Sequence, residues 1–465
     1  MAEPGMEFQL IAGLVVAIAL LIFLVVKTKV HAVVALVIAA SLAGLIGGML
    51  PADVISAITT GFGSTLSTIG LVIGFGVMMG RVLEISGAAE QMAYSLIRWV
   101  GKKREDWAMV LTGYVVSIPI FCDSAFVILT PLIKALARST GKSILTLGIS
   151  LAGGLMLTHH AVPPTPGPLG VAGIYGIDIG LMIFWGVIFT LPGMAVLVFY
   201  GRFMGPRLEK MILDDTGEDI GAAYRQFEEA ATERQKELPS LFLSILPLIL
   251  PIALIFLNTL ATFVVKTSGD AELANSFLVQ LFSFIGNPVI AVGLGLLVAV
   301  YTLIPTVPRT DAIAYMEQGV ESAGIILLVT GAGGALGAVL RASGAGDVIG
   351  EAVAGLPIPA ILIPFLISSL VRMIQGSGTV AMITGASISA PILMAMPDVN
   401  MVFAAQAAAI GSMVFGYFND SYFWVINRML GVKNAKHQML LWSVPTTLAW
   451  MSALVMLLIC NALFG

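Results

Sequence analysis

The stretch GGLMLTHHAVPPTPGPLG, residues 153–170, interrupts a hydrophobic run at a point where a membrane helix is expected to continue. The apolar segment SILTLGISLAGGLML leads into its polar centre, and VAGIYGIDIGLMIFWGVIFTLP follows it. Proline removes a backbone donor from a helix interior and glycine weakens helices, so we expect the helix to break here. The segment at about 144–176 is therefore predicted to be two half-helices, 144–157 and about 169–176, with an unwound middle.

The composition of the whole chain indicates the surroundings of this break. The chain has 465 residues, of which 58% are hydrophobic and 11% are charged, and its mean hydropathy is +0.99. Soluble domains carry about 25% charged residues. Apolar runs of about 20 residues, the length that crosses a bilayer, recur along the chain. We therefore predict an all-α polytopic membrane protein, placed in the lipid bilayer of the cell (inner) membrane as a multi-pass protein.

A second interruption lies upstream in WAMVLTGYVVSIPIFCDSAFVILTPLIKAL, residues 107–136. Basic residues flank it on both sides: Lys102, Lys103 and Arg104, and then Lys134, Arg138 and Lys142. Basic segments tend to stay in the cytoplasm, and a single crossing would leave one of these clusters outside. We favour a re-entrant hairpin at about 107–138 over one long span. Its polar tip SIPIFCDS is then buried in protein or lines a cavity.

The second half of the chain repeats this order of features. GRVLEISG at 80–87 matches GAVLRASG at 337–344. A second hairpin is predicted at about 357–396 with RMIQGSGT at its tip, followed by a broken helix at about 401–431 that contains FGYFNDS. The basic residues place the starts of the two halves on opposite sides of the membrane. The sequence therefore predicts two inverted repeats, an arrangement found in many secondary transporters.

Polar residues stand where each of the four predicted half-helices begins. Half-helix N-termini carry free N–H groups and the positive end of the helix dipole, so four that converge form an anion site. The alternative is that these residues only cap their own helices. The candidate substrate-binding residues are Asp123, Ser124, Thr158, His159, His160, Thr165, Arg372, Gln375, Ser377, Gly378, Thr379, Asn419 and Asp420.

Ionisable groups at membrane depth are expensive and are functional candidates by default. Asp123 and Asp420 are the acidic residues that the topology places near the membrane middle, and with His159 they are the candidates for carrying a coupled proton. A permanent structural hydrogen bond is the alternative. Arg372 can bind a substrate carboxylate in a fork geometry, form a salt bridge with Asp420, or lie at the interface. Gln375 can donate to a hydroxyl or a carboxylate.

Several kinds of site are not indicated. The chain has no HExxH motif and no pair of thiolates, so no metal site is expected. Nucleotide-binding glycine motifs are missing from the required strand-to-helix context, and no cofactor is predicted. Basic residues are scattered among loops, which does not indicate nucleic acid. No nucleophile has an activating base at a fixed spacing, so we do not expect an enzyme.

THHAVPPTPGP, together with FCDSAFVILTPLI, QGSGTVAMITGASISAP and FGYFNDSYFWVINR, resembles the gluconate permease family of the ion-transporter superfamily. The resemblance runs from about residue 8 to about residue 463. It implies a proton-coupled symporter for gluconate or related small hydroxy- or amino-carboxylates, D-serine included. It also implies a homodimer in which a transport domain with two re-entrant hairpins moves against a scaffold domain, as an elevator.

On this basis the chain is expected to divide into five parts. These are 1–66, N-terminal scaffold helices; 67–200, the first repeat; 201–238, a cytoplasmic connector; 239–319, central scaffold helices; and 320–465, the second repeat.

The chain departs from the family pattern inside the expected site. It has THH and PPTPGP where close relatives of the gluconate permeases have THG and PPHPGP, and Asp123 where they often carry Glu. We therefore expect a small organic anion as substrate, either a gluconate-like sugar acid or a shorter hydroxy acid such as glycerate or 3-hydroxybutyrate. The alternatives are a symporter for D-serine or another small amino acid, and an uncoupled anion facilitator or channel.

Overall fold

The computed structural model describes residues 4–28, 30–101, 103–216, 238–268, 276–304, 309–345, 348, 359–417 and 420–465. These residues contain helices and connecting segments and no β-strand. Five of the helices are long and apolar enough to cross a membrane, or up to seven crossings if each bent pair is one span. Most of the predicted connector, 217–237, lies outside the described residues, as does the start of the second predicted hairpin, 357–358.

The helices follow one another along the chain as α1 (Pro4–Val26), α2 (Ala32–Ile46), α3 (Pro51–Ile85), α4 (Ala88–Val100), α5 (Glu105–Val116), α6 (Cys122–Thr140), α7 (Ile144–Ala161), α8 (Pro166–Tyr175), α9 (Ile179–Thr216), α11 (Leu241–Ser268), α13 (Phe277–Ile285), α14 (Pro288–Leu303), α15 (Arg309–Ala342), α17 (Leu362–Gln375), α18 (Gly378–Met394), α19 (Met401–Gly411), α20 (Ser421–Met429), α21 (Ala435–Gln438) and α22 (Val444–Phe464).

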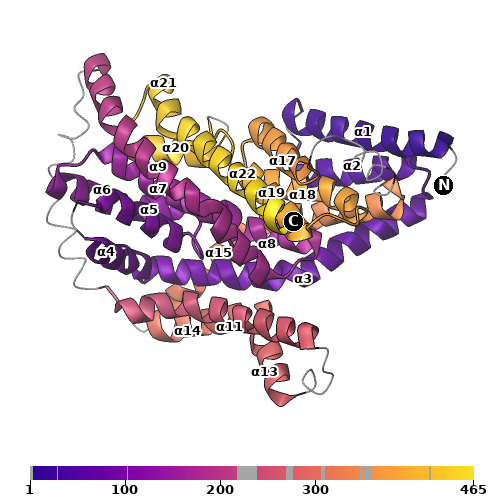
Figure 1. The fold of residues 1–465 in the computed structure, drawn as a ribbon, viewed down its shortest axis with the longest axis horizontal. Coiled ribbons are helices and arrows are strands. Elements are labelled where there is room, and N and C mark those ends of the chain that lie inside the picture. The colour runs from indigo at the N-terminus through magenta and orange to yellow at the C-terminus, as the bar shows by residue number, and fades with distance from the viewer. Residues whose placement is uncertain are drawn as a thin grey trace.

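The long helices α3 and α15 pack along each other through the middle of the molecule. Helices α1 and α2 lie together at one end, while α11, α13 and α14 lie together on one side of α3, where α14 packs against it (Figure 1). The opposite side carries α5 to α9 and α17 to α22, which contain the hairpins and the broken helices. Helix α3 bends by 44° between Ser67 and Gly70. The predicted boundary at 66/67 therefore lies inside one helix, as the boundary at 319/320 lies inside α15.

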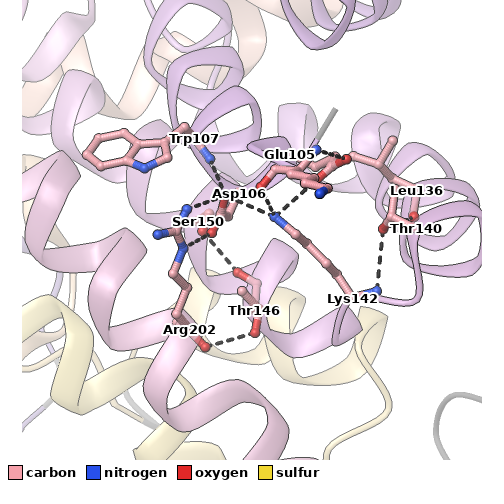
Figure 2. A network of polar contacts seen from close by, with 11 residues as sticks. Glu105, Asp106, Trp107, Leu136, Thr140, Lys142, Thr146, Ser150 and Arg202 are labelled. Atoms are coloured by element: carbon pink, nitrogen blue, oxygen red, sulfur yellow. Dashed lines mark hydrogen bonds and ion pairs between the residues drawn. The ribbon is translucent and has the colours of Figure 1, made fainter. Parts of the chain in front are cut away.

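The first hairpin consists of α5 and α6, joined by residues 117–121. Its two ends meet, because Lys142, just after α6, reaches the start of α5 (Figure 2). The Lys142 Nζ atom lies 2.9 Å from Glu105 Oε2 and 3.2 Å from Asp106 Oδ1, and it donates to the backbone oxygen of Lys103 at 2.9 Å. The chain thus returns to the end at which it entered, which is the geometry of a re-entrant helix pair.

Asp106 holds these ends to the rest of the molecule. Its side chain is fully buried and accepts from both Nε and Nη2 of Arg202 on α9, with 3.1 Å between Nη2 and Oδ1. The backbone N–H of Trp107 donates to the same carboxylate at 3.0 Å. A buried charge is tolerated only when it is paired and hydrogen-bonded, and these bonds meet that condition. The carboxylate therefore links α5, α9 and the loop after α6.

The tip of this hairpin lies directly against α3. A Cβ atom built on Gly80 would stand 2.1 Å from the backbone oxygen of Pro119, closer than real carbon atoms approach oxygen. Only glycine at position 80 therefore allows α3 and the hairpin tip to lie at this distance. The contact places the start of α6 in the middle of the molecule, beside the end of α7.

The first broken helix differs in its limits from the sequence expectation. Helix α7 continues to Ala161, so His159 and His160 lie in its last turn and not in the unwound segment. The residue before a proline avoids helical dihedrals, so the break begins at Val162, next to Pro163, and not four residues earlier. Helix α8 begins at Pro166 because proline is suited to the first turn. The Pro163–Pro164 bond in the break is cis.

The second hairpin and the second broken helix have the same design. Helices α17 and α18 are joined at Gly376 and Ser377, and they pack against each other and against α19. Helices α19 and α20 are separated by a non-helical segment, of which 412–417 and 420 are described. The α18 helix also packs against α8 and α15, so both halves of the chain meet around it.

We expect Asp106→Asn to destabilise the fold, because the substitution removes the negative charge that pairs with Arg202 and Lys142. Both cations are partly exposed, with 43% and 25% of the side chain accessible, and can be rehydrated, so the cost should be about 2 kcal/mol. The apparent Tm of the purified protein in detergent should fall by several degrees. The control is Asp398→Asn, at an exposed carboxylate. An equal Tm for both variants would contradict this role.

Candidate functional site

A cavity of about 590 Å³ lies where the two hairpin tips meet the two broken helices. Its polar wall comes from the starts of α6, α18 and α20 and from the last turns of α7 and α17, while Ile325, Ile326 and Val329 of α15 form an apolar wall. The predicted site residues that line it are Asp123, Ser124, His159, His160, Arg372, Ser377, Gly378, Thr379 and Asp420.

The other predicted site residues stand elsewhere or are not described. Thr158 is fully buried and its hydroxyl donates to the backbone oxygen of Tyr114 at 2.7 Å, so it fixes α7 against α5. The hydroxyl of Thr165 donates to the backbone oxygen of Val162 at 2.7 Å and closes the turn of the break. Neither lines the cavity. Asn419 and the side chain of Gln375 lie outside the described part of the chain.

A buried ion pair joins the tip of the second hairpin to the second broken helix. The Nη2 atom of Arg372 lies 2.6 Å from Oδ2 of Asp420, and the two side chains are 5% and 9% exposed. The Nη1 atom of Arg372 also donates to the backbone oxygen of Gly376. Asp420 Oδ1 accepts from the backbone N–H of Tyr422 at 3.2 Å and so caps α20. Of the roles open to Arg372 from sequence, the structure shows the salt bridge with Asp420.

Asp123 has no such cationic partner. Its Oδ2 accepts from the hydroxyl of Ser421 at 3.0 Å, and the thiol of Cys122 lies 3.5 Å from Oδ1. Within the described ranges it forms no ion pair. The Asp123–Ser421 bond joins the tip of the first hairpin to the start of α20, so the two halves of the chain are bonded directly across the cavity. Asp123 is thus the carboxylate of this cavity that no cation neutralises by contact.

The half-helix N-termini at the cavity are not equivalent. The N-terminus of α20 already faces the carboxylate of Asp420. Helix α6 begins after Phe121 with no side-chain cap, and α18 has only the neutral hydroxyl of Ser377, which accepts from Val380 N at 3.4 Å. The first turn of α6 carries the carboxylate of Asp123 but has no side-chain cap, so the N–H groups at the starts of α6 and α18 have no carboxylate bonded to them.

The two histidines bring unsatisfied polar atoms to the cavity. His160 Nδ1 is bonded to the backbone oxygen of Met156 at 2.9 Å, while its Nε2 has no hydrogen-bond partner among the described residues. His159 Nδ1 is likewise buried without a protein partner, and its ring lies 6.0 Å from the ring of Phe121. Buried polar atoms are normally hydrogen-bonded, so these exceptions, in side chains that line a cavity, are candidates for contact with a ligand or water.

Part of the cavity wall was not predicted from the sequence. Phe121, Cys122, Met156, Tyr422 and Trp442 all line the cavity. Trp442 is 1% exposed and its Nε1 has no protein partner in the described chain. It lies in a short π-helical segment, 439–443, just before α22. An aromatic residue in an apolar span carries no sequence signal for such a position, although π-helical turns are frequent at functional sites.

The described residues contain no group of three or more His, Cys, Asp and Glu side chains placed to hold a metal ion. The cavity offers hydrogen-bonding groups, helix N-termini and the side chains of Arg372, Asp123 and Asp420.

The chain is similar to known permeases over nearly all its length. It is 54% identical over 458 residues to an uncharacterized permease of Haemophilus influenzae, covering 98% of this chain and 93% of the relative. It is 34% identical over 458 residues to a gluconate permease of Pseudomonas aeruginosa, covering 98% of each. Among solved structures, MtrF of Neisseria gonorrhoeae, presented as illuminating a class of antimetabolite efflux pumps, matches with a TM-score of 0.65 over 96% of this chain and 97% of that chain.

The match to MtrF has only 16% sequence identity, so it supports the fold: an all-helical polytopic membrane protein with broken and re-entrant helix pairs. The family model for GntP family permeases matches residues 9–463. These are transporters and not enzymes. The chain is therefore a multi-pass membrane protein that belongs to the GntP family of bacterial permeases.

Proposed function

We propose that this permease is a secondary active transporter that imports a small organic carboxylate, a gluconate-like sugar acid or a short hydroxy acid, in symport with protons. The observation that carries the proposal is a cavity in which two half-helix N-termini have no carboxylate hydrogen-bonded to their N–H groups. A substrate carboxylate at these N–H groups would be bound without a cation of its own. The volume of about 590 Å³ suits a small molecule.

The charges that line the cavity support proton coupling. Arg372 offsets Asp420, and Asp123 leaves one net negative charge when it is ionised. An anionic substrate would bring a second negative charge into a buried space, where charges repel strongly. One proton taken up with the substrate cancels that increase. We therefore propose a symporter in which substrate and proton bind together.

Asp123 is our first choice for the proton-carrying residue. Asp420 is already bound to Arg372 and to the N-terminus of α20. Asp123 has only hydroxyl and thiol partners, which tolerate a protonated carboxyl. His159 is the other candidate, because its Nδ1 atom faces no protein partner in the described chain.

The arrangement of the cavity wall also suggests how access alternates. Apart from Trp442, the polar side chains lining the cavity come from a hairpin or a broken helix, while the wall on α15 is apolar. Such a wall lets the polar half of the site move past it without breaking hydrogen bonds. We propose an elevator mechanism with inverted repeats, in which a scaffold of about 1–66 and 239–319 supports the moving repeats. The homodimer implied by the family resemblance is part of this proposal.

Two alternatives have specific support. In a symporter for D-serine or another small amino acid, the substrate ammonium would pair with Asp123, the carboxylate that lacks a cation. In an uncoupled facilitator, the same cavity would bind the anion without a proton. Accumulation above the external concentration distinguishes transport driven by an ion gradient from facilitated diffusion.

The first test is uptake by proteoliposomes. We expect gluconate, glycerate or 3-hydroxybutyrate to accumulate when the external medium is acidic relative to the lumen, and accumulation to stop when a protonophore collapses the gradient. Liposomes without protein are the control. Uptake that follows an imposed sodium gradient and ignores pH would overturn the proton part of the proposal.

The second test removes the proposed proton carrier. We expect Asp123→Asn to abolish accumulation driven by a pH gradient, because the amide cannot gain and lose a proton in the cycle. Exchange of labelled for unlabelled substrate should persist, since an amide still accepts a hydrogen bond from Ser421. Asp398→Asn, at an exposed carboxylate, is the matched control. Full gradient-driven accumulation by Asp123→Asn would exclude Asp123 as the carrier.

A further inference from the structure

The hydrogen bond of His160 determines what its second nitrogen can recognise. Nδ1 lies 2.9 Å from the backbone oxygen of Met156, and a carbonyl oxygen can only accept. Nδ1 therefore carries the proton of the neutral ring, and Nε2 is left with a lone pair as an acceptor. That Nε2 atom is buried and has no partner among the described residues. His160 is 5% exposed, so bulk water has little access to it.

The Nε2 atom of His160 lies directly beside the N-terminus of α18. A Cβ atom built on Gly378 would stand 2.2 Å from His160 Nε2, so the ring occupies the space that any side chain at position 378 would need. Gly378 is the first residue of α18, whose N–H groups are proposed to hold the substrate carboxylate. A carboxylate bound there would bring the groups on its first and second carbons close to His160 Nε2.

An acceptor in this place favours one type of neighbour to the carboxylate. A hydroxyl or an amino group can donate to Nε2, whereas an oxo group presents lone pairs to another lone pair. A site built to receive a donor rejects the analogue that lacks it, because the buried polar atom is then left without a bond. No other donor of the described chain satisfies Nε2 in this structure.

We infer that His160 is a specificity-determining residue that selects carboxylates with a hydroxyl or amino donor on the first or second carbon from the carboxylate, against the corresponding oxo acids. The inference rests on the proposed function and names the substrate class of the same site. His159 is not assigned this role, because no described contact places it beside Gly378.

The experiment compares pairs of ligands that differ in one group. Dissociation constants for lactate and pyruvate, and for 3-hydroxybutyrate and 3-oxobutyrate, are measured by calorimetry on the purified protein. The unaltered protein should bind the hydroxy member of at least one pair at least about tenfold more tightly, as expected for the loss of one hydrogen bond to a buried acceptor.

His160→Phe should reduce this ratio by about tenfold, because phenylalanine fills the space but accepts no hydrogen bond. The change should come from weaker binding of the hydroxy acid, with binding of the oxo acid unchanged or improved. His160→Gln should keep a preference for the hydroxy acid but bind the oxo acid better, since its amide can both accept and donate. The ratio separates recognition from a merely structural role, which would weaken both ligands alike.

His437→Phe is the matched control, because His437 is also buried but lies outside the cavity, with its Nε2 3.2 Å from Asp215 Oδ2. It should leave the ratio unaltered. A ratio that is the same in His160→Phe and in the unaltered protein, or an equal loss for both members of a pair, overturns the inference. If the unaltered protein binds none of these acids and no gluconate, the proposed function fails and the inference fails with it.

Discussion

The ion pair between Arg372 and Asp420 is the interaction on which the candidate site depends. It joins the last turn of α17 to the first turn of α20, and Arg372 also binds the backbone at Gly376. Removing one member of such a buried pair leaves an uncompensated charge, at a cost of about 3–5 kcal/mol. The pair therefore keeps the tip of the second hairpin, and with it the N-terminus of α18, facing the cavity.

The same pair decides how the remaining charges can act. Because Arg372 is already bound to Asp420, the proposed substrate anion would be left to the backbone N–H groups of α6 and α18. Asp123 is left as the carboxylate without a cation. Helix N-termini hold an anion through aligned N–H groups and partial charges instead of a full cationic charge. This division of roles suits a site that must bind its substrate and also release it.

The two histidines show where reasoning from sequence reached its limit. Their place beside a break rich in proline indicated that they face the site, and both do line the cavity. The assumption that they belong to the unwound segment was wrong, since α7 continues to Ala161. Being helical, they point in different directions, and only the position of Gly378 in the fold shows that Nε2 of His160 lies against α18. Trp442, from the last apolar span, carried no signal at all.

The sequence by itself determined the class of the protein and the places where its helices are interrupted. Hydrophobic runs must cross the bilayer as helices, and prolines, glycines and polar residues within them mark breaks that only a protein interior can shelter. The tertiary structure decided which of these polar residues meet. Thr158 and Thr165 donate to backbone oxygens away from the cavity, while Asp123 and Ser421, 298 positions apart, bond across the cavity. Such contacts depend on how the helices pack. Packing brings together residues that lie far apart in the sequence, and the sequence alone does not show which ones will meet.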